Sequence, residues 1–573
     1  MKESRPGAVL NRGLALAILI WLLQPFVSGI AQEPNRASAA QQTAAAPESL
    51  ESLRSRLLAQ ISQPRFAPAA WGVKVVSLET GKTLFDHNSD KYFNPASNAK
   101  LYTVALALDR LGPDYRIKTS LYSRVRPDAA GTLKGDLTIY GRGDPAMAAR
   151  LNDGDYYKPL EPLAAVLMNA GVRRIEGDLI GDESYFTGPP LGSGWNWDDL
   201  QWYYGAEVSA LSLNDNSVDL FAKPADRVGI PSRLSTGPPT SHVTLINRTL
   251  TVAKGEPLRI SVYRPVGENI IYVSGRVPIG SAGYSGSVAV HNPAGLFVNL
   301  FKEVLARHGI EVTGRSRTID WKYREVTPVD LAKLVELGGV ESLPLADLAR
   351  ETLKPSQNLY AQLLLLQVGA NGAQVANQAT SGAPESQSGA SNPRSQIPGS
   401  KSETSSLKSD SARTPQPPAT NPFMTTEDAG VEAMRAFLAE VGIKKGDVLL
   451  EEGSGLSRRD VITPAATVEL LKFMSRHRWA GVYADAMPVA GVDGTLQNRM
   501  KGTAAANNVR AKTGSLRYVF TLSGYVTDAA GERLAFSIML NNYYSADRTA
   551  SPREDIDAIA VMLAGFTGHT GKN

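Results

Sequence analysis

The sequence predicts an α+β protein in which an antiparallel sheet with helices is interrupted by a large β-rich insert. Three observations support this fold class. A strand–turn–strand pattern followed by a helix occupies residues 71–111, short alternating runs between turn signals fill residues 114–285, and a second strand pair with a closing helix occupies residues 518–565. At 573 residues the chain is also too long for one domain of ordinary size.

The first 31 residues are typical of a secretory signal peptide. A basic start, an apolar run and a small-x-small cleavage site follow one another: Lys2, Arg5 and Arg12; residues 14–23; and Gly29-Ile30-Ala31. So short an apolar run does not span a bilayer comfortably, so we expect cleavage and no stable membrane span afterwards. Retention as an anchor is the alternative. Residues 32–47 are polar and Ala-rich, which indicates a flexible leader.

Residues 48–113 are expected to begin the sheet-and-helix domain. Apolar alternation from Trp71, a turn at Thr80-Gly81 and a return strand predict a β-hairpin. A helix follows, with Asn94 as a favourable N-cap and Pro95 at its first helical position.

In residues 114–285 the pattern changes to short runs of alternating apolar and polar residues, and we expect one or more inserted β-rich domains there. Helical spacing of apolar residues returns at Ala294, and a strongly apolar helix is expected from Ser356 to Val368. We therefore assign residues 286–370 to the second part of the sheet-and-helix domain.

Residues 371–422 are rich in Ser, Gly, Ala, Pro, Gln and Asn and contain no aromatic residue. Such a stretch buries too little apolar surface to offset its ordering entropy, so we predict a disordered low-complexity insertion. Order is expected to return in residues 423–573, the third part of the domain. That part should contain a helix at 465–474, a strand pair within 518–542 and a last amphipathic helix at 554–565.

The composition excludes several classes of site. The chain has no cysteine, which removes thiol catalysis, Cys-ligated zinc, iron–sulfur clusters and disulfides. The formal net charge of +4 gives no support for binding to nucleic acid. The six histidines form no H-E-x-x-H zinc motif, and no G-x-S-x-G elbow is present. Nothing in the sequence calls for a metal or an organic cofactor.

Three short motifs occur in one order: Ser97-Asn98-Ala99-Lys100, Ser356-Gln357-Asn358 and Lys512-Thr513-Gly514. Each motif alone is weak. A second S-x-x-K begins at Ser405, but it lies in the stretch predicted to be disordered, and a second S-x-N begins at Ser212 within the insert. K-T-G occurs once.

Ser97 and Lys100 are the candidate nucleophile and base. From the predicted N-cap, Ser97 falls in the first turn of a helix, and Lys100, three residues later, shares its face. A serine hydroxyl is a poor nucleophile until a base removes its proton. A lysine can do so only when it is neutral, which burial or a neighbouring cation favours.

The other two motifs can supply proton transfer and substrate contacts. Ser356 can pass a proton to a leaving amine, and the amide of Asn358 can hold a lysine while it donates to a substrate carbonyl. The K-T-G segment reads as a strand, in which Lys512 supplies fixed positive charge.

The end of the K-T-G strand is suited to binding a terminal carboxylate. The hydroxyls of Thr513 and Ser515 can donate to such a group. Gly514, without a side chain, lets a ligand approach the backbone closely.

This ordered set resembles the penicillin-recognising serine enzymes, and its surroundings are similar to the class C low-molecular-mass penicillin-binding proteins, the D-alanyl-D-alanine carboxypeptidase/endopeptidase family. The similar stretches run through most of the chain, with 371–422 as an unmatched insertion: residues 94–102, 141–145, 203–216, 354–362, 453–457, 491–500 and 511–516. Two residues depart from the family pattern. Gln357 stands where Asp is frequent, and Glu452 replaces an Asp.

The resemblance implies a penicillin-recognising serine transpeptidase-like domain with domains inserted between its first two motifs, in agreement with the β-rich insert. It also implies catalytic roles. Ser97 attacks the penultimate D-Ala carbonyl and forms an acyl-enzyme, with Lys100 as the base. Ser356 and Lys512 help to deliver a proton to the departing D-Ala, and Asn358 contacts the substrate amide.

The resemblance further implies an oxyanion hole made by the backbone N–H groups of Ser97 and Ser515. Water then deacylates the enzyme, and the group that activates this water stays open. The resemblance implies peptidoglycan peptides as substrates and β-lactam antibiotics as covalent inhibitors.

The sequence therefore predicts an exported serine-type DD-peptidase of the periplasm or another extracytoplasmic space. A β-lactamase-like hydrolase and a catalytically silent wall-binding scaffold of the same fold are the alternatives. The balance between carboxypeptidase and endopeptidase activity stays open, as do the third residue of the stem peptide, the oligomeric state and the role of the insert.

Overall fold

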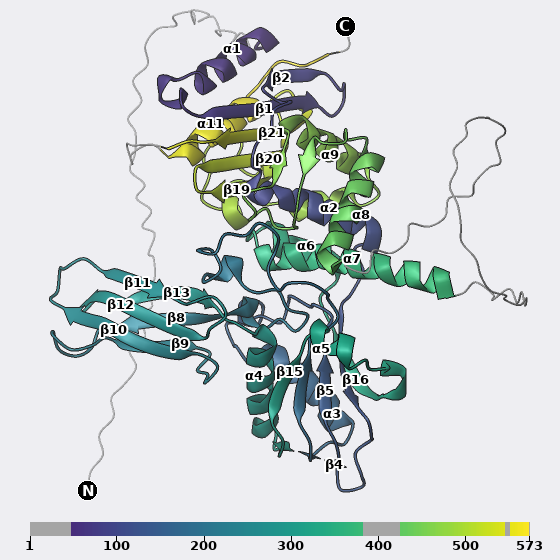
Figure 1. Cartoon of the computed structure of the whole chain (residues 1–573). Coiled ribbons are helices and arrows are strands. Elements are labelled where there is room, and N and C mark those ends of the chain that lie inside the picture. Colours follow the sequence, from purple (N-terminus) through teal and green to yellow (C-terminus); the bar gives the residue numbers. More distant parts are fainter. Residues whose placement is uncertain (1–46, 382–423, 545–550, 572–573) are drawn as a thin grey trace, which may run out of the picture. The chain divides into compact units, whose positions relative to one another are not determined.

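The computed structural model describes residues 47–381, 424–544 and 551–571 (Figure 1). The predicted signal peptide, the leader up to residue 46 and residues 382–422 of the predicted disordered insertion lie outside these ranges. None of the helices within the described ranges combines the length and the apolar character that crossing a membrane requires.

The domain that carries the three motifs is built on a five-stranded antiparallel sheet with the order β19-β20-β21-β1-β2. The first and last parts of the chain meet at its centre, where Val73 of β1 lies opposite Ile538 of β21. The strands are β1 (Ala70–Ser77), β2 (Thr83–His87), β19 (Arg510–Leu516), β20 (Val519–Thr527) and β21 (Arg533–Asn541). Both predicted strand pairs are confirmed.

Helices cover both faces of this sheet, because alternate residues of its central strands are apolar on each side. Val73 and Ile538 face a core shared with α1 (Leu50–Ile61) and α11 (Pro552–Ala564), whereas Ala535 and Met539 face a second core. The helices of the second core are α2 (Ala99–Leu111), α6 (Leu345–Leu353), α7 (Asn358–Ser381), α8 (Thr426–Val441), α9 (Pro464–Arg476) and α10 (Ala480–Asp485). A short pair of strands, β17 (Val448–Leu449) and β18 (Val461–Ile462), lies between α8 and α9 in the chain.

The insert contains a mixed five-stranded sheet with the order β15-β7-β5-β3-β16. Its strands are β3 (Lys118–Ser123), β5 (Leu137–Tyr140), β7 (Leu179–Asp182), β15 (Ser316–Ile319) and β16 (Val335–Glu341). The helices α3 (Glu161–Asn169) and α4 (Pro293–Arg307) pack with it, and α5 (Trp321–Val326) follows β15. A small parallel sheet joins β4 (Thr132–Leu133), β6 (Arg174–Ile175) and β14 (Glu311–Val312).

Two further three-stranded sheets complete the insert. One has the order β13-β8-β9 and the other the order β10-β12-β11. Their strands are β8 (Ser217–Lys223), β9 (Arg233–Gly237), β10 (Thr244–Val252), β11 (Arg259–Tyr263), β12 (Ile270–Pro278) and β13 (Tyr284–Ala289). The predicted β-rich character of residues 114–285 is confirmed.

The predicted end of the insert at residue 285 is wrong. β15 pairs in parallel with β7, and β16 pairs antiparallel with β3, so the insert continues to Glu341. The helix predicted from Ala294, now α4, buries Phe297 and Phe301 in the core of the insert and not against the sheet that carries the motifs. Local helical spacing reveals a helix, but it does not reveal which sheet the helix covers.

The boundary of the predicted disordered insertion also moves. The helix expected to end at Val368 continues as α7 to Ser381, so residues 371–381 are helical in the structure. Its apolar first half anchors this helix, since Leu363, Leu364 and Leu365 are buried. Helix propagation from an anchored start costs less than nucleation, which explains how polar residues continue it.

Candidate active site

Ser97 lies in a tight turn that joins the sheet to α2. The prediction placed it in the first turn of an α-helix capped by Asn94, but residues Ala96–Asn98 form a 3-10 turn and α2 begins at Ala99. Ala96 has a φ of 47°, in the left-handed region, which an α-helix cannot contain. The side chain of Asn94 accepts a hydrogen bond from the backbone of Ala96 at 3.0 Å, as in an Asx turn.

Lys100 is completely buried, and its Nζ atom has three oxygen neighbours. The distances are 2.8 Å to Ser97 Oγ, 2.6 Å to Asn358 Oδ1 and 2.6 Å to the carbonyl oxygen of Ser454. The amide and carbonyl oxygens can only accept, so they take the two N–H groups of a neutral amine. The lone pair is then left for Ser97, whose hydroxyl donates. The predicted contact between Ser97 and Lys100 is present, and its geometry suits proton abstraction.

The pKa of Lys100 also favours the neutral amine. Burial lowers the pKa of Lys100 to about 7, although the carboxylates of Glu452 and Asp460 act in the opposite direction. The charge of Glu452 is itself held by the backbone, since its carboxylate accepts from the N–H groups of Ser454 and Leu456 at 2.7 and 2.9 Å. Near neutral pH a substantial share of Lys100 is therefore free of its proton.

The S-x-N motif lies in a turn before α7, with Ser356 in the left-handed region at a φ of 68°. Ser356 Oγ accepts a hydrogen bond from Lys512 Nζ at 2.8 Å. Asn358 is the first residue of α7, and its amide nitrogen donates to the backbone oxygen of Tyr204 at 2.7 Å, while its oxygen accepts from Lys100. One amide thus joins the lysine of the first motif to a segment of the insert.

Contacts from both sides hold this strained turn. Lys354 Nζ lies 2.5 Å from Asp493 Oδ2, and the backbone of Thr495 donates to the carbonyl of Lys354 at 3.0 Å. From the insert, Asp215 Oδ2 accepts from the amide of Gln357 at 3.1 Å. Gln357 departs from the family pattern, and its amide N–H group donates to Asp215. An ionised aspartate at this position would have no such group to donate.

Lys512 is also completely buried, and this corrects one sequence-based expectation. Burial, together with the charges of Lys100 and Arg499, lowers the pKa of Lys512 well below its usual value. No carboxylate of the described chain lies within ion-pair distance of its Nζ atom. Burial therefore disfavours the charged form of Lys512 in the free protein. It gains a proton readily only when an anion is beside it.

The K-T-G motif lies on β19, which is the edge strand of the sheet. Thr513 donates its hydroxyl to Thr495 at 2.8 Å, whereas Ser515, near the end of the strand, is exposed. An edge strand with an exposed hydroxyl can pair with an extended peptide and bind its end. The structure thus brings residues from the start, the middle and the end of the chain into one cluster of contacting side chains.

Gly514 packs closely against other parts of the chain and does not face open space. A Cβ atom at this position would lie 2.7 Å from the carbonyl oxygen of Pro95 and would overlap the hydroxyl of Thr521. Pro95 immediately precedes the turn that carries Ser97, and Thr521 holds it by donating to its carbonyl at 2.9 Å. The absence of a side chain at Gly514 therefore lets β19 support the turn that carries Ser97.

We expect Gly514→Ala to slow acylation of Ser97 by about a hundredfold, because displacement of a reacting group by roughly 1 Å has costs of that order. The rate of covalent labelling by a fluorescent penicillin measures the effect. Gly481→Ala is the matched control, because a Cβ atom there meets nothing within 4 Å. Equal rates for the two variants would contradict the supporting role of Gly514.

Several residues around the site were not selected from the sequence. Glu452 was noticed only as a departure from a pattern, and Asp460, Tyr204, Asp215 and Thr495 were not singled out. Tyr204 and Ser454 contribute backbone oxygens, for which the side chain gives no signal. The stretches similar to the family, 203–216, 453–457 and 491–500, do contain Tyr204, Asp215, Ser454 and Thr495, and this similarity is the available hint.

The decoy motifs lie elsewhere. Ser212, in the second S-x-N, is buried in the insert and donates to the carbonyl of Ser209 at 2.8 Å. The second S-x-x-K, from Ser405, lies outside the described residues.

Comparison with known proteins gives consistent results. The chain matches the D-Ala-D-Ala carboxypeptidase 3 (S13) family over residues 53–387 and 420–565. It is 32% identical over 534 residues to a D-alanyl-D-alanine carboxypeptidase of Actinomadura sp. (strain R39), covering 91% of this chain and 86% of that protein. It is 24% identical over 480 residues to the D-alanyl-D-alanine carboxypeptidase DacB of Haemophilus influenzae, covering 82% and 85%.

The fold has a solved counterpart. Penicillin binding protein 4 (dacB) from Haemophilus influenzae matches with a TM-score of 0.68 at 23% sequence identity, over 89% of this chain and 98% of that one. The gap in the family match, between residues 387 and 420, falls inside the insertion that the sequence analysis left unmatched.

Proposed function

The chain belongs to the D-Ala-D-Ala carboxypeptidase 3 (S13) family of serine peptidases, and from this premise we propose that Ser97 is its nucleophile. The observation that carries the proposal is the arrangement around Lys100. The buried amine of Lys100 contacts two oxygens that can only accept hydrogen bonds, Asn358 Oδ1 and the carbonyl oxygen of Ser454. Its third contact is Ser97 Oγ, at 2.8 Å. The protein is a serine-type D-Ala-D-Ala carboxypeptidase, and the assignment of individual residues rests on this geometry.

In the proposed acylation step, the proton of Ser97 passes to Lys100 while Oγ bonds to the penultimate D-Ala carbonyl carbon. The backbone N–H groups of Ser97 and Ser515 hold the developing oxyanion. The C–N bond then breaks, and the leaving amine takes the hydroxyl proton of Ser356. Lys512, protonated beside the bound carboxylate, replaces that proton across its 2.8 Å contact with Ser356 Oγ. Water hydrolyses the acyl-enzyme and regenerates Ser97.

We assign Lys512, Thr513 and Ser515 to the terminal carboxylate of the substrate, and Asn358 to its amide. Because Lys512 is buried without a counter-charge, a bound carboxylate raises its proton affinity and so draws a proton into the site. Recognition of the carboxylate is thereby coupled to charging of the lysine. Cleavage of cross-links is included in the proposal, since an edge strand can accept an extended peptide on either side of the scissile bond.

Penicillins are proposed as covalent inhibitors that acylate Ser97. The related Haemophilus influenzae protein has been solved in complex with a β-lactam. Peptidoglycan lies outside the cytoplasmic membrane, and the composition of residues 1–31 is that of an export signal. We therefore place the enzyme in the periplasm or another extracytoplasmic space.

The two alternative functions are less well supported. A silent scaffold does not require a buried lysine whose amine lies next to a serine hydroxyl. A β-lactamase-like hydrolase fits the motifs, but the family match covers the insert as well as the motif-bearing domain. Release of D-Ala from a D-Ala–D-Ala peptide separates a peptidase from both.

We expect this release to continue at an unchanged rate in excess chelator, because the Ser97–Lys100 pair supplies both nucleophile and base. The measurement is D-Ala production from a diacetylated tripeptide with and without EDTA. Inhibition by EDTA that zinc reverses would contradict the serine–lysine assignment. Rapid turnover of penicillin without release of D-Ala would favour the β-lactamase alternative.

A further inference from the structure

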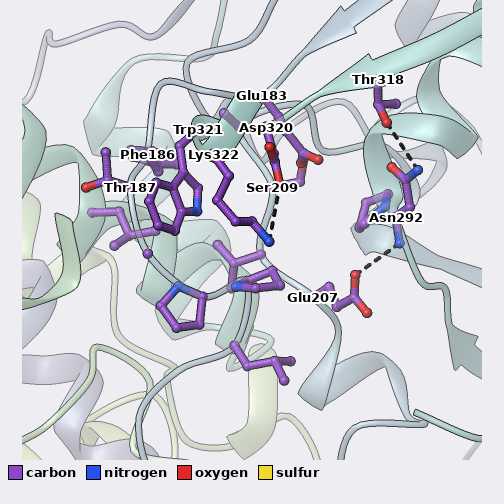
Figure 2. Close-up of a pocket in the computed structure, with 18 of the residues that line it drawn as sticks. Glu183, Phe186, Thr187, Glu207, Ser209, Asn292, Thr318, Asp320, Trp321 and Lys322 are labelled. Atoms are coloured by element: carbon purple, nitrogen blue, oxygen red, sulfur yellow. Dashed lines mark hydrogen bonds and ion pairs between the residues drawn. The ribbon is translucent and has the colours of Figure 1, made fainter. Parts of the chain in front are cut away.

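A cavity with a volume of about 670 Å³ lies apart from Ser97. This volume is within the range of ligand-binding pockets. Figure 2 shows Trp321, Lys322 and Glu183 toward one side of the hollow and Glu207 and Asn292 toward the other. Its walls come from the insert and from α7 and α8, and neither Ser97 nor Lys100 lines it.

Two carboxyl groups on this cavity have no cationic partner among the described residues: Glu183 and Glu427. The hydroxyl of Ser209 donates to Glu183, which forms no ion pair. Glu427 accepts from Ser193 Oγ at 2.6 Å and from the amide of Gln362, and it also forms no ion pair. All of these partners are neutral.

The charged forms of Glu183 and Glu427 are unfavourable in this cavity. Burial raises the pKa of Glu183 to about 7, and the negative charges of Glu207 and Asp320 act in the same direction. Burial also raises the pKa of Glu427 to about 7, and the carboxylate of Glu452 adds to this effect. A cation placed beside either carboxylate would relieve the cost of burying its charge, which is the usual reason for such groups to face a pocket.

The positive groups already on the cavity wall are committed to other carboxylates. Lys322 Nζ lies 3.5 Å from Asp320 Oδ2, and its side chain is exposed. His291 Nδ1 lies 2.8 Å from Glu207 Oε1. Neither Lys322 nor His291 forms an ion pair with Glu183 or Glu427.

The remaining wall is apolar. Phe186 and Leu366 are buried and line the cavity, and Trp321 adds an indole ring. Methylene groups can pack against such a wall, and an aromatic face also attracts an ammonium group.

We propose that this cavity is a binding site for a primary ammonium group carried on a short aliphatic stem. An ammonium lies beside Glu183 or Glu427, or at both when the ligand is a diamine, and the stem lies against Trp321, Phe186 and Leu366. The two sources of such a group are a free diamine and an amine side chain of a peptide. The site is separate from Ser97, so this proposal does not depend on the proposed acylation chemistry.

The test is a calorimetric titration of the whole protein with 1,5-diaminopentane and, separately, with 1,5-pentanediol, which has the same length and no charge. We expect the diamine to bind at least about tenfold more tightly than the diol, because a buried charge-assisted hydrogen bond is worth roughly 1.5–3 kcal/mol. Equal binding of the two, or no binding of the diamine, would overturn the proposal.

Matched variants locate the site. Glu183→Gln and Glu427→Gln should each weaken diamine binding about tenfold or more. Glu325→Gln removes the same charge from an exposed position on α5 that does not line the cavity, and it should leave affinity within about twofold. If all three variants bound alike, the diamine would be held elsewhere and the proposal would fail. Two independent variants guard against misfolding of either one, which thermal melting detects.

Two further arms distinguish the sources and separate this proposal from the proposed function. Nα-acetyl-lysine methylamide carries the amine on a peptide unit, so tighter binding than the diamine indicates a peptide source and weaker binding a free amine. Penicillin labelling of Glu183→Gln should match that of the unchanged protein. Diamine binding should in turn be unchanged in Ser97→Ala, so failure of one assignment leaves the other intact.

Discussion

Ser97→Ala is expected to abolish covalent labelling by penicillin, where the unchanged protein gives a single adduct in its intact mass. Without the hydroxyl there is no atom to form the acyl bond, so the loss is complete and not a slower reaction. Hydrolysis of a D-Ala–D-Ala peptide should fall by about 10⁴-fold or more, since removal of a nucleophile leaves only what binding and an oxyanion hole supply.

Ser356→Ala is the matched control for this loss. It removes a hydroxyl from the same cluster of side chains, where Ser356 contacts Lys512 at 2.8 Å. We expect an adduct still to form at Ser97, only more slowly, because proton delivery and not the nucleophile is affected. A full adduct in Ser97→Ala would place the nucleophile on another residue, and no adduct in Ser356→Ala would contradict a role of Ser356 in proton delivery alone.

Lys100→Met is expected to slow acylation by roughly a thousandfold for every ligand, which is the size of effect that loss of a general base produces. Methionine fills the buried space without a basic atom. In the unchanged protein, the neutral amine is the active form. Since burial lowers the pKa of Lys100 to about 7, the acylation rate should fall as pH drops below about 7 and level off above it. Stopped-flow labelling across pH 5.5–9 measures both effects.

Lys512→Met provides the contrast. We expect it to slow acylation strongly for ligands with a free carboxylate and much less for matched amide-capped ligands, because its charge forms only beside an anion. An equal loss with both kinds of ligand would assign Lys512 to proton transfer instead. A pH profile of Lys100→Met that kept the same inflection would show that another group titrates near pH 7.

The parts of the site that the sequence predicted depend on short spacings or on order. A separation of three residues placed Ser97 and Lys100 together, and their side chains are in contact at 2.8 Å. The order of the three motifs, with similar surroundings, indicated that Asn358 and Lys512 join them. These inferences required no knowledge of distant packing.

The parts that were wrong depend on distant packing. Asn94 is of a residue type favoured at helix N-caps. Its amide nitrogen, however, donates to the carbonyls of Ser457 and Asp460 at 3.2 and 3.0 Å. The chain is thereby held in a turn, and the α-helix starts later. The sequence also does not show that Lys512 is buried, which disfavours its charged form. The end of the insert was misplaced because β15 and β16 pair with strands far earlier in the chain.

The pairing of β1 with β21 at the centre of the motif-bearing sheet has a consequence for how the enzyme is made. Its partners, such as Val73 and Ile538, come from opposite ends of the chain, and contacts between such distant segments form late in folding. The sheets of the insert use only strands between Lys118 and Glu341, so the insert can bury its own core while the ribosome is still adding the C-terminal part. Ser97 and Lys100 are synthesised early, but the strands that support them are among the last. A growing chain therefore carries Ser97 without a complete site until β19, β20 and β21 have been added.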